Sequence, residues 1–152
     1  MEAQRLADQV RRSYEGGAWH GPSLGELLEG VTAEEAARRP LPAAHSIWEL
    51  VHHVEAWERE ALLTLQGKTY ESHSGDRDWP PVVATTAECW QAALERLRST
   101  CLALVAAIGE IDDDQLDEVV AGREFSYYVL LHGVVQHNLY HAGQISLLKR
   151  QL

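Results

Sequence analysis

The amino-acid sequence predicts an all-α protein folded as a four-helix bundle. Apolar residues recur at helical spacing in four long segments, while the alternation typical of strands is not found over any length. Helix start signals precede several of these segments. Because 152 residues are enough to bury one core, we expect a single domain that spans residues 1–152.

The first predicted helix covers residues 2–14 and ends before a pair of glycines. Two short helices should follow, beginning at Ser23 and Thr32, because each residue opens the Ser/Thr-x-x-Glu pattern of a capping box. A third capping box begins at Ser46. It opens the second long helix, whose apolar spacing continues to Leu65.

Residues 68–84 are polar and turn-rich. We expect this connection to cross one end of the bundle, because it is too long for a tight hairpin. The third long helix should begin at Thr85 and continue to Gly109. Residues 112–120 should add a short turn, and the fourth long helix should cover residues 126–149.

The charge balance argues against nucleic acid and anionic lipid as partners. The chain has 13 Lys and Arg residues against 23 Asp and Glu residues, a formal net charge of −10 that repels phosphate backbones. Its longest apolar run has only eight residues, 101–108, and residues 1–5 are charged where a signal peptide would be apolar. We therefore expect a soluble, cytoplasmic protein with no membrane partner.

Two histidines of the fourth long helix have the spacing of a metal site. His137 and His141 are four residues apart, so a helix places both imidazoles on one face with Cβ atoms roughly 6 Å apart. Two ring nitrogens can then approach one ion at about 2.1 Å each. The alternative is that both are core residues that donate to carbonyls, but a shared ion would satisfy both at once.

Helical phase selects a third ligand from the other histidines, which are His20, His45, His52, His53, His73 and His132. His53 lies three residues after Leu50 and four before Trp57, so it shares a face with core positions. His52 lies on a more polar face and is expected at the surface or rim. His132 lies about 140° around its helix from the His137 and His141 pair. The predicted ligands are therefore His53, His137 and His141.

Other polar and aromatic residues have simpler expected roles. Three glutamates of the second long helix should lie on its solvated face: Glu55, Glu58 and Glu60. Three tryptophans should lie in the core: Trp48, Trp57 and Trp90. Cys89 and Cys101 would be about 18 Å apart along one helix, too far for a disulfide.

The order of three motifs resembles that of the DinB/YfiT-like superfamily of metalloenzymes. The motifs are Trp19-His20-Gly21-Pro22-Ser23-Leu24, Ala44-His45-Ser46-Ile47-Trp48-Glu49-Leu50-Val51-His52-His53-Val54-Glu55-Ala56-Trp57-Glu58, and His137-Asn138-Leu139-Tyr140-His141-Ala142-Gly143-Gln144-Ile145. The resemblance implies a four-helix bundle of up-down-down-up order. It also implies a divalent ion, often zinc or nickel, held by one histidine of the second helix and two of the fourth. At the matching positions these ligands are again His53, His137 and His141.

The resemblance also implies a class of chemistry. Some members of the superfamily are thiol S-transferases that use bacillithiol, mycothiol or glutathione, and a related branch isomerises maleylpyruvate. Three neutral histidines leave an ion with open positions, which is typical of catalytic sites, whereas a fourth protein ligand such as His45 would favour a structural one. Asn138 stands where a metalloprotease helix needs Glu, which argues against peptide hydrolysis of that type.

The predicted function is therefore metal-dependent transfer of a low-molecular-weight thiol to a small-molecule substrate. The alternatives are a metal-dependent hydrolase, and a non-enzymatic metal-binding or stress-response bundle whose metal is structural or a sensor. We expect the chain to assemble as a homodimer.

Overall fold

The computed structural model describes residues 1–152 and contains seven α-helices, one short 3-10 helix and no β-strand. The helices are α1 (Glu2–Glu15), α2 (Leu24–Leu28), α3 (Ala33–Ala37), α4 (Ile47–Leu65), η1 (Gly75–Arg77), α5 (Ala87–Glu110), α6 (Asp113–Asp117) and α7 (Tyr127–Lys149). The all-α prediction is confirmed.

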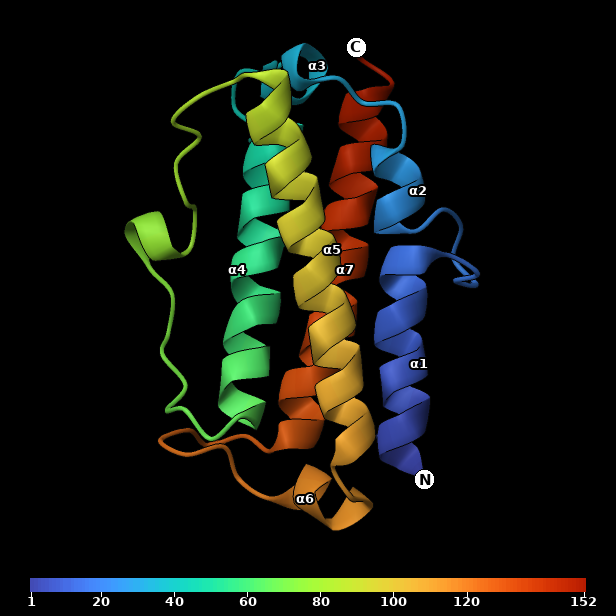
Figure 1. The fold of residues 1–152 in the computed structure, drawn as a ribbon, viewed down its shortest axis with the longest axis vertical. Helices are drawn as coiled ribbons and strands as arrows, with labels where there is room; N and C mark the ends of the chain where they lie inside the picture. Colours follow the sequence, from blue (N-terminus) through green and yellow to red (C-terminus); the bar gives the residue numbers. More distant parts are fainter.

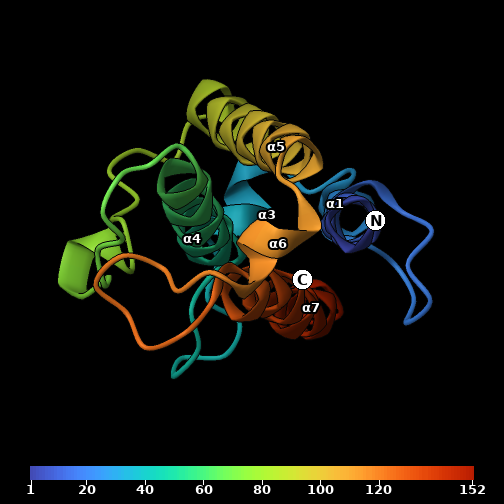
Figure 2. The ribbon, with the colours of Figure 1, turned by 90° about the horizontal axis from the view of Figure 1, so that it is seen from below.

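Four long helices, α1, α4, α5 and α7, lie side by side around one core (Figure 2). Helices α1 and α7 run in one direction along the long axis, and α4 and α5 run in the other (Figure 1). Each long helix packs against two of the others. The largest side chains buried between them include Trp48, Trp90, Leu97, Leu104, Leu131 and Ile145. Helix α3 lies at one end of the four and α6 at the other, and α2 follows the end of α1 and lies beside α7 (Figure 1).

The three predicted capping boxes are present. The side chains of Ser23, Thr32 and Ser46 each accept a hydrogen bond from the backbone N–H three residues later. The side chain of the glutamate at that later position accepts in turn from the backbone N–H of the cap residue. The start of α5 differs by one residue from the prediction, because Thr86 rather than Thr85 accepts from the N–H of Cys89. Thr86 as the cap puts Trp90 in the first turn facing the core, where it is 1 % exposed.

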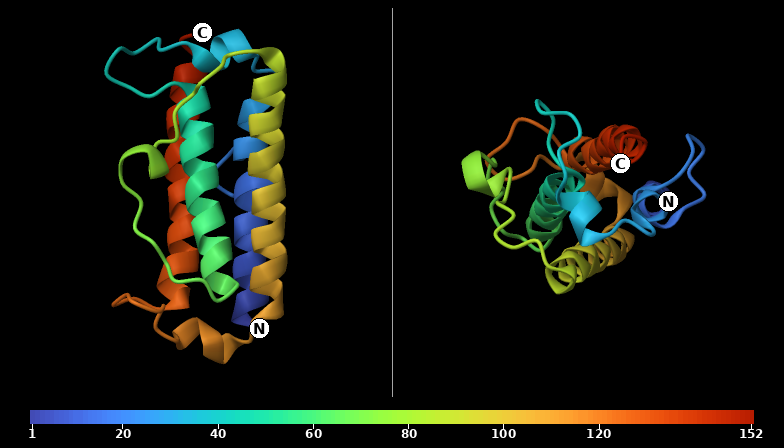
Figure 3. Two further views of the ribbon diagram at one scale, coloured as in Figure 1. Left: turned by 60° about the vertical axis from the view of Figure 1, so that its left-hand side comes forward. Right: turned by 90° about the horizontal axis from the view of Figure 1, so that it is seen from above.

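The prediction for residues 68–84 was wrong. This segment, here called the strap, does not cross an end of the bundle but runs along the outer side of α4 for most of its length (Figure 3). The reason is that α4 and α5 run in the same direction, so the connection must return from the end of α4 to the level of its start. The strap thereby places Asp78 and Trp79 beside α4.

Two predicted surface glutamates are instead buried, Glu60 under the strap and Glu58 in the bundle interior. Glu60 is 7 % exposed, and its carboxylate accepts from the N–H of Glu71 at 2.6 Å and lies 3.3 Å from Nε2 of His73. Glu58 is fully buried and faces the bundle interior. Of the three glutamates, only Glu55 keeps partial exposure. Helix α4 is therefore covered on two sides, by the bundle and by the strap.

Both cysteines are free thiols. Cys89 is exposed, Cys101 is buried, and neither forms a disulfide, as predicted. None of the helices combines the length and the apolar composition needed to cross a membrane.

Candidate metal centre

Three imidazoles from two helices meet inside the bundle: His53 on α4, and His137 and His141 on α7. Nε2 of His137 lies 3.0 Å from Nε2 of His53 and 3.1 Å from Nε2 of His141. The three nitrogens all lie within 4.8 Å of one another, and no carboxylate or thiol belongs to the group. The structure thus brings together the three residues that the sequence singled out.

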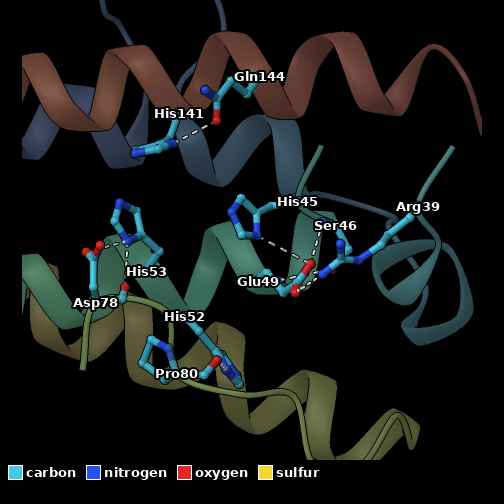
Figure 4. A network of polar contacts seen from close by, with 10 residues as sticks. All are labelled: Arg39, His45, Ser46, Glu49, His52, His53, Asp78, Pro80, His141 and Gln144. Carbon is cyan, nitrogen blue, oxygen red and sulfur yellow. Dashed lines mark hydrogen bonds and ion pairs between the residues drawn. The ribbon is translucent and has the colours of Figure 1, made fainter. Parts of the chain in front are cut away.

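Hydrogen bonds at the far side of two rings fix which nitrogen faces the cluster. Nδ1 of His53 lies 2.6 Å from the carbonyl oxygen of Asp78, and Nδ1 of His141 lies 2.9 Å from Oε1 of Gln144 (Figure 4). Because both partners are acceptors, each Nδ1 carries the proton and donates it. Nε2 of each ring is then unprotonated and presents its lone pair to the cluster, the arrangement of metal-binding histidines.

The donor set fits a divalent metal ion. Nε2 of His53 and Nε2 of His141 each present a lone pair to His137. A proton on Nε2 of His137 could form a hydrogen bond to only one of these two atoms at a time. A cation between the three nitrogens satisfies all of them at once. Two nitrogens bound to one tetrahedral zinc ion at about 2.1 Å would be about 3.4 Å apart, close to the separations of 3.0 and 3.1 Å seen here.

Burial keeps the three imidazoles neutral. It lowers the pKa of His137 to about 3, with the neighbouring rings of His141 and His53 adding to the effect. Burial also lowers the pKa of His53 and of His141 below the ordinary histidine value. Neutral imidazole is the form that binds a metal, so these shifts reduce competition from protons.

A pH titration of metal content follows from these shifts. Protonation of a ligand releases the metal, so content must fall as the pH falls. Because burial lowers the pKa of all three imidazoles, we expect bound metal to stay constant as the pH falls through the ordinary histidine value of about 6.5, and to be lost only at lower pH. Dialysis at each pH followed by elemental analysis measures this. Loss of half the metal already near pH 6.5 would contradict it.

The strap contributes residues that the sequence analysis did not identify. The indole of Trp79 lies between two imidazoles, with ring centroids 3.5 Å from His45 and 3.9 Å from His53 and interplanar angles of 7° and 6°. The indole N–H of Trp57 donates to Oδ1 of Asp78 at 2.9 Å. Asp78 and Trp79 therefore hold His53 in place. Helical phase gave no signal for them, because the strap is not helical there.

None of the other histidines joins the cluster. His45 stacks on Trp79 and is not a fourth ligand here. Its Nδ1 lies 3.8 Å from the Glu49 carboxylate (Figure 4). His52 accepts from the indole N–H of Trp48 at 3.0 Å, and its Nδ1 lies 3.2 Å from the carbonyl oxygen of Pro80. The remaining three lie elsewhere: His20, His73 and His132.

A cavity of about 590 Å³ opens beside the three imidazoles. Its walls come from α4, the strap, the loop before α7, and α7 itself, and most of them are apolar or aromatic. Trp57 lines this cavity, so its expected place in the core was only partly right; Trp48 and Trp90 are buried as predicted. A small molecule bound in the cavity would contact the three imidazoles directly.

A buried polar network lies next to the cluster. Nδ2 of Asn138 donates to Oε1 of Glu58 at 2.8 Å and to Oγ of Ser13 at 3.0 Å, linking α7, α4 and α1. Asn138 and Glu58 are both 0 % exposed. Burial raises the pKa of Glu58 to about 8, so its carboxyl group is mainly protonated at pH 7. The core beside the histidines therefore holds no permanent negative charge from Glu58.

Comparison with known proteins gives one match. The model of the family described as the DinB superfamily matches residues 18–145. This span contains the three histidines of the cluster, the strap and all residues that line the cavity. No curated protein and no solved structure matches the chain.

Proposed function

Because this chain belongs to the DinB superfamily, we propose that it binds a divalent metal ion through His53, His137 and His141 and acts as a metal-dependent thiol S-transferase. The family match confirms the resemblance found in the sequence. The observation that carries the proposal is the convergence of three neutral imidazoles at the wall of a cavity large enough for a small molecule.

The helix directions, the donor atoms and the net charge also support the proposal. The directions of the four long helices support the up-down-down-up order of the DinB/YfiT-like bundle (Figure 1). Three imidazole nitrogens favour zinc or nickel over calcium or magnesium, which prefer oxygen ligands. The net charge of −10 supports a small-molecule substrate rather than nucleic acid or membrane.

The chain's residues would prepare the site for a thiol. When bound, a divalent ion would supply Lewis acidity and stabilise the thiolate form of a low-molecular-weight thiol near neutral pH. Asp78 and Gln144 orient the imidazoles of His53 and His141 through hydrogen bonds. The apolar walls exclude water from the nucleophile. The sulfur of the bound thiol then forms a bond to a carbon atom of the electrophile. The leaving group departs with the electron pair of the broken bond, and the thiol proton goes to solvent.

The surroundings favour a thiol over water as nucleophile. Two carboxyl groups line the cavity, and one of them, Glu58, is mainly protonated at pH 7 and is therefore a poor base for water. The other, Asp78, accepts from the indole N–H of Trp57 at Oδ1, which also lies 3.2 Å from Nδ1 of His53. A free thiol has a pKa near 8.5 and water one of about 15.7, so a thiol needs far less activation.

The experiment uses protein loaded with cobalt(II), whose absorption spectrum reports its ligands. Bacillithiol, mycothiol, glutathione and cysteine are added in turn, with 1-chloro-2,4-dinitrobenzene as electrophile. We expect at least one thiol to change the spectrum and to be consumed faster than with metal-free protein. If no thiol changes the spectrum and none is consumed, the proposed thiol S-transferase activity is wrong. Hydrolysis or a non-catalytic metal site then becomes the better account.

A further inference from the structure

Aromatic rings form much of the wall of the cavity beside the histidine cluster. They come from separate parts of the chain: Trp57 from α4, Tyr70 and Trp79 from the strap, and Phe125 from the loop before α7. Tyr70 and Phe125 meet edge to face, with centroids 5.7 Å apart and an interplanar angle of 88°. Rings in such arrangements offer both faces and edges to a further aromatic group.

The cavity offers no cation of its own. None of its 14 lining residues is Lys or Arg. Its two carboxyl groups already accept hydrogen bonds from Trp57 and Asn138. A carboxylate, sulfonate or phosphate group placed against the apolar walls, away from the three imidazoles, would lose its hydration without gaining a cationic partner, which is unfavourable. An uncharged apolar group would lose no such interaction.

The size of the cavity also limits the ligand. A volume of about 590 Å³ lies in the middle of the range for small-molecule sites, roughly 300–1,000 Å³. It is enough for one or two fused rings next to a small metal-bound group. It is too small for a long peptide or an oligosaccharide.

We propose that this cavity binds an uncharged aromatic group, so that the thiol acceptor is an aromatic electrophile whose reacting atom points towards Nε2 of His53, His137 and His141. This inference rests on the proposed function, since it names the substrate class of the same site. It predicts that charged parts of a thiol such as glutathione lie outside the aromatic walls.

A glycine on α7 allows the cavity to be filled without moving the protein. Gly133 lines the cavity, and a Cβ added there would meet nothing within 4 Å. Gly133→Leu therefore projects a side chain into open space, and leucine is the better helix former. Gly143 is a matched control, because it lies on the same helix, is exposed, and has equally open surroundings.

The test compares two probes of similar size by isothermal titration calorimetry: 2-naphthalenemethanol, which is uncharged, and 2-naphthalenesulfonate, which is anionic. Both are titrated into zinc-loaded and metal-free protein. We expect the alcohol to bind at least about tenfold more tightly than the sulfonate to the metal-free protein, in which no cation lines the cavity. Gly133→Leu should weaken binding of the alcohol by at least about tenfold with unchanged zinc content, and Gly143→Leu should change neither.

The outcomes separate this inference from the proposed function. Equal binding of the two probes to the metal-free protein, or undiminished binding of the alcohol to Gly133→Leu, would overturn the aromatic substrate class even if zinc binds as proposed. Selective binding of the alcohol to a protein that takes up no zinc would support the cavity assignment and contradict the metal-dependent function.

Discussion

Replacement of His137 by alanine is expected to lower the bound divalent metal by at least about tenfold. His137 is the middle member of the cluster, with its Nε2 3.0 Å and 3.1 Å from those of His53 and His141. Without it, two nitrogens remain where three would bind. The free energy of metal binding that is lost with one ligand exceeds the roughly 1.4 kcal/mol that corresponds to a factor of ten. Elemental analysis after dialysis in dilute metal measures the effect.

His20→Ala is the matched control for this experiment, because His20 is exposed and lies outside the cluster. Its metal content should equal that of the unmodified protein. His53→Ala and His141→Ala should behave like His137→Ala, with helical circular dichroism spectra showing that the variants fold. Equal metal content in His137→Ala and the unmodified protein would contradict the assignment of the ligands.

Replacement of Asn138 by alanine should destabilise the metal-free protein by about 2–4 kcal/mol. Asn138 is 0 % exposed, and its Nδ2 donates to both Glu58 and Ser13. Its loss leaves the buried carboxyl group of Glu58 without its hydrogen-bond donor and opens a small cavity. Urea unfolding measures the change, which corresponds to a fall in melting temperature of roughly 5–15 °C.

Gln136→Ala provides the comparison for Asn138→Ala. Gln136 is an exposed amide on the same helix, so its removal should change stability by less than about 0.5 kcal/mol. Metal-free protein is used because Asn138 is adjacent to His137, and a change in metal affinity would otherwise contribute to the result. Similar stability of the two variants would mean that the buried network does not hold α1, α4 and α7 together.

The helices and the three histidines could be predicted because both depend on local spacing. Capping boxes at Ser23, Thr32 and Ser46 involve residues only three positions apart, so the sequence specifies them directly. The prediction that His53 lies beside the pair on α7 required one further assumption, namely that core-facing positions of neighbouring helices meet. This assumption holds for His53, because α4 and α7 pack against each other.

The strap could not be predicted, because its path depends on the directions of helices far apart in the chain. Asp78 and Trp79 contact His53 only because α4 and α5 run in the same direction. The burial of Glu58 and Asn138 was missed for a different reason. A periodicity argument assigns polar residues to the solvent, whereas these two form a hydrogen bond with each other in the interior. Only Gln144, three residues after His141, had a spacing that could have revealed its role.

Diffraction from crystals of the zinc-loaded protein, measured on both sides of the zinc absorption edge, tests the central claim most directly. The account predicts one strong anomalous peak between the imidazoles, about 2.1 Å from Nε2 of His53, His137 and His141. A peak at other residues, or no peak while the three imidazoles keep their present contacts, would contradict it.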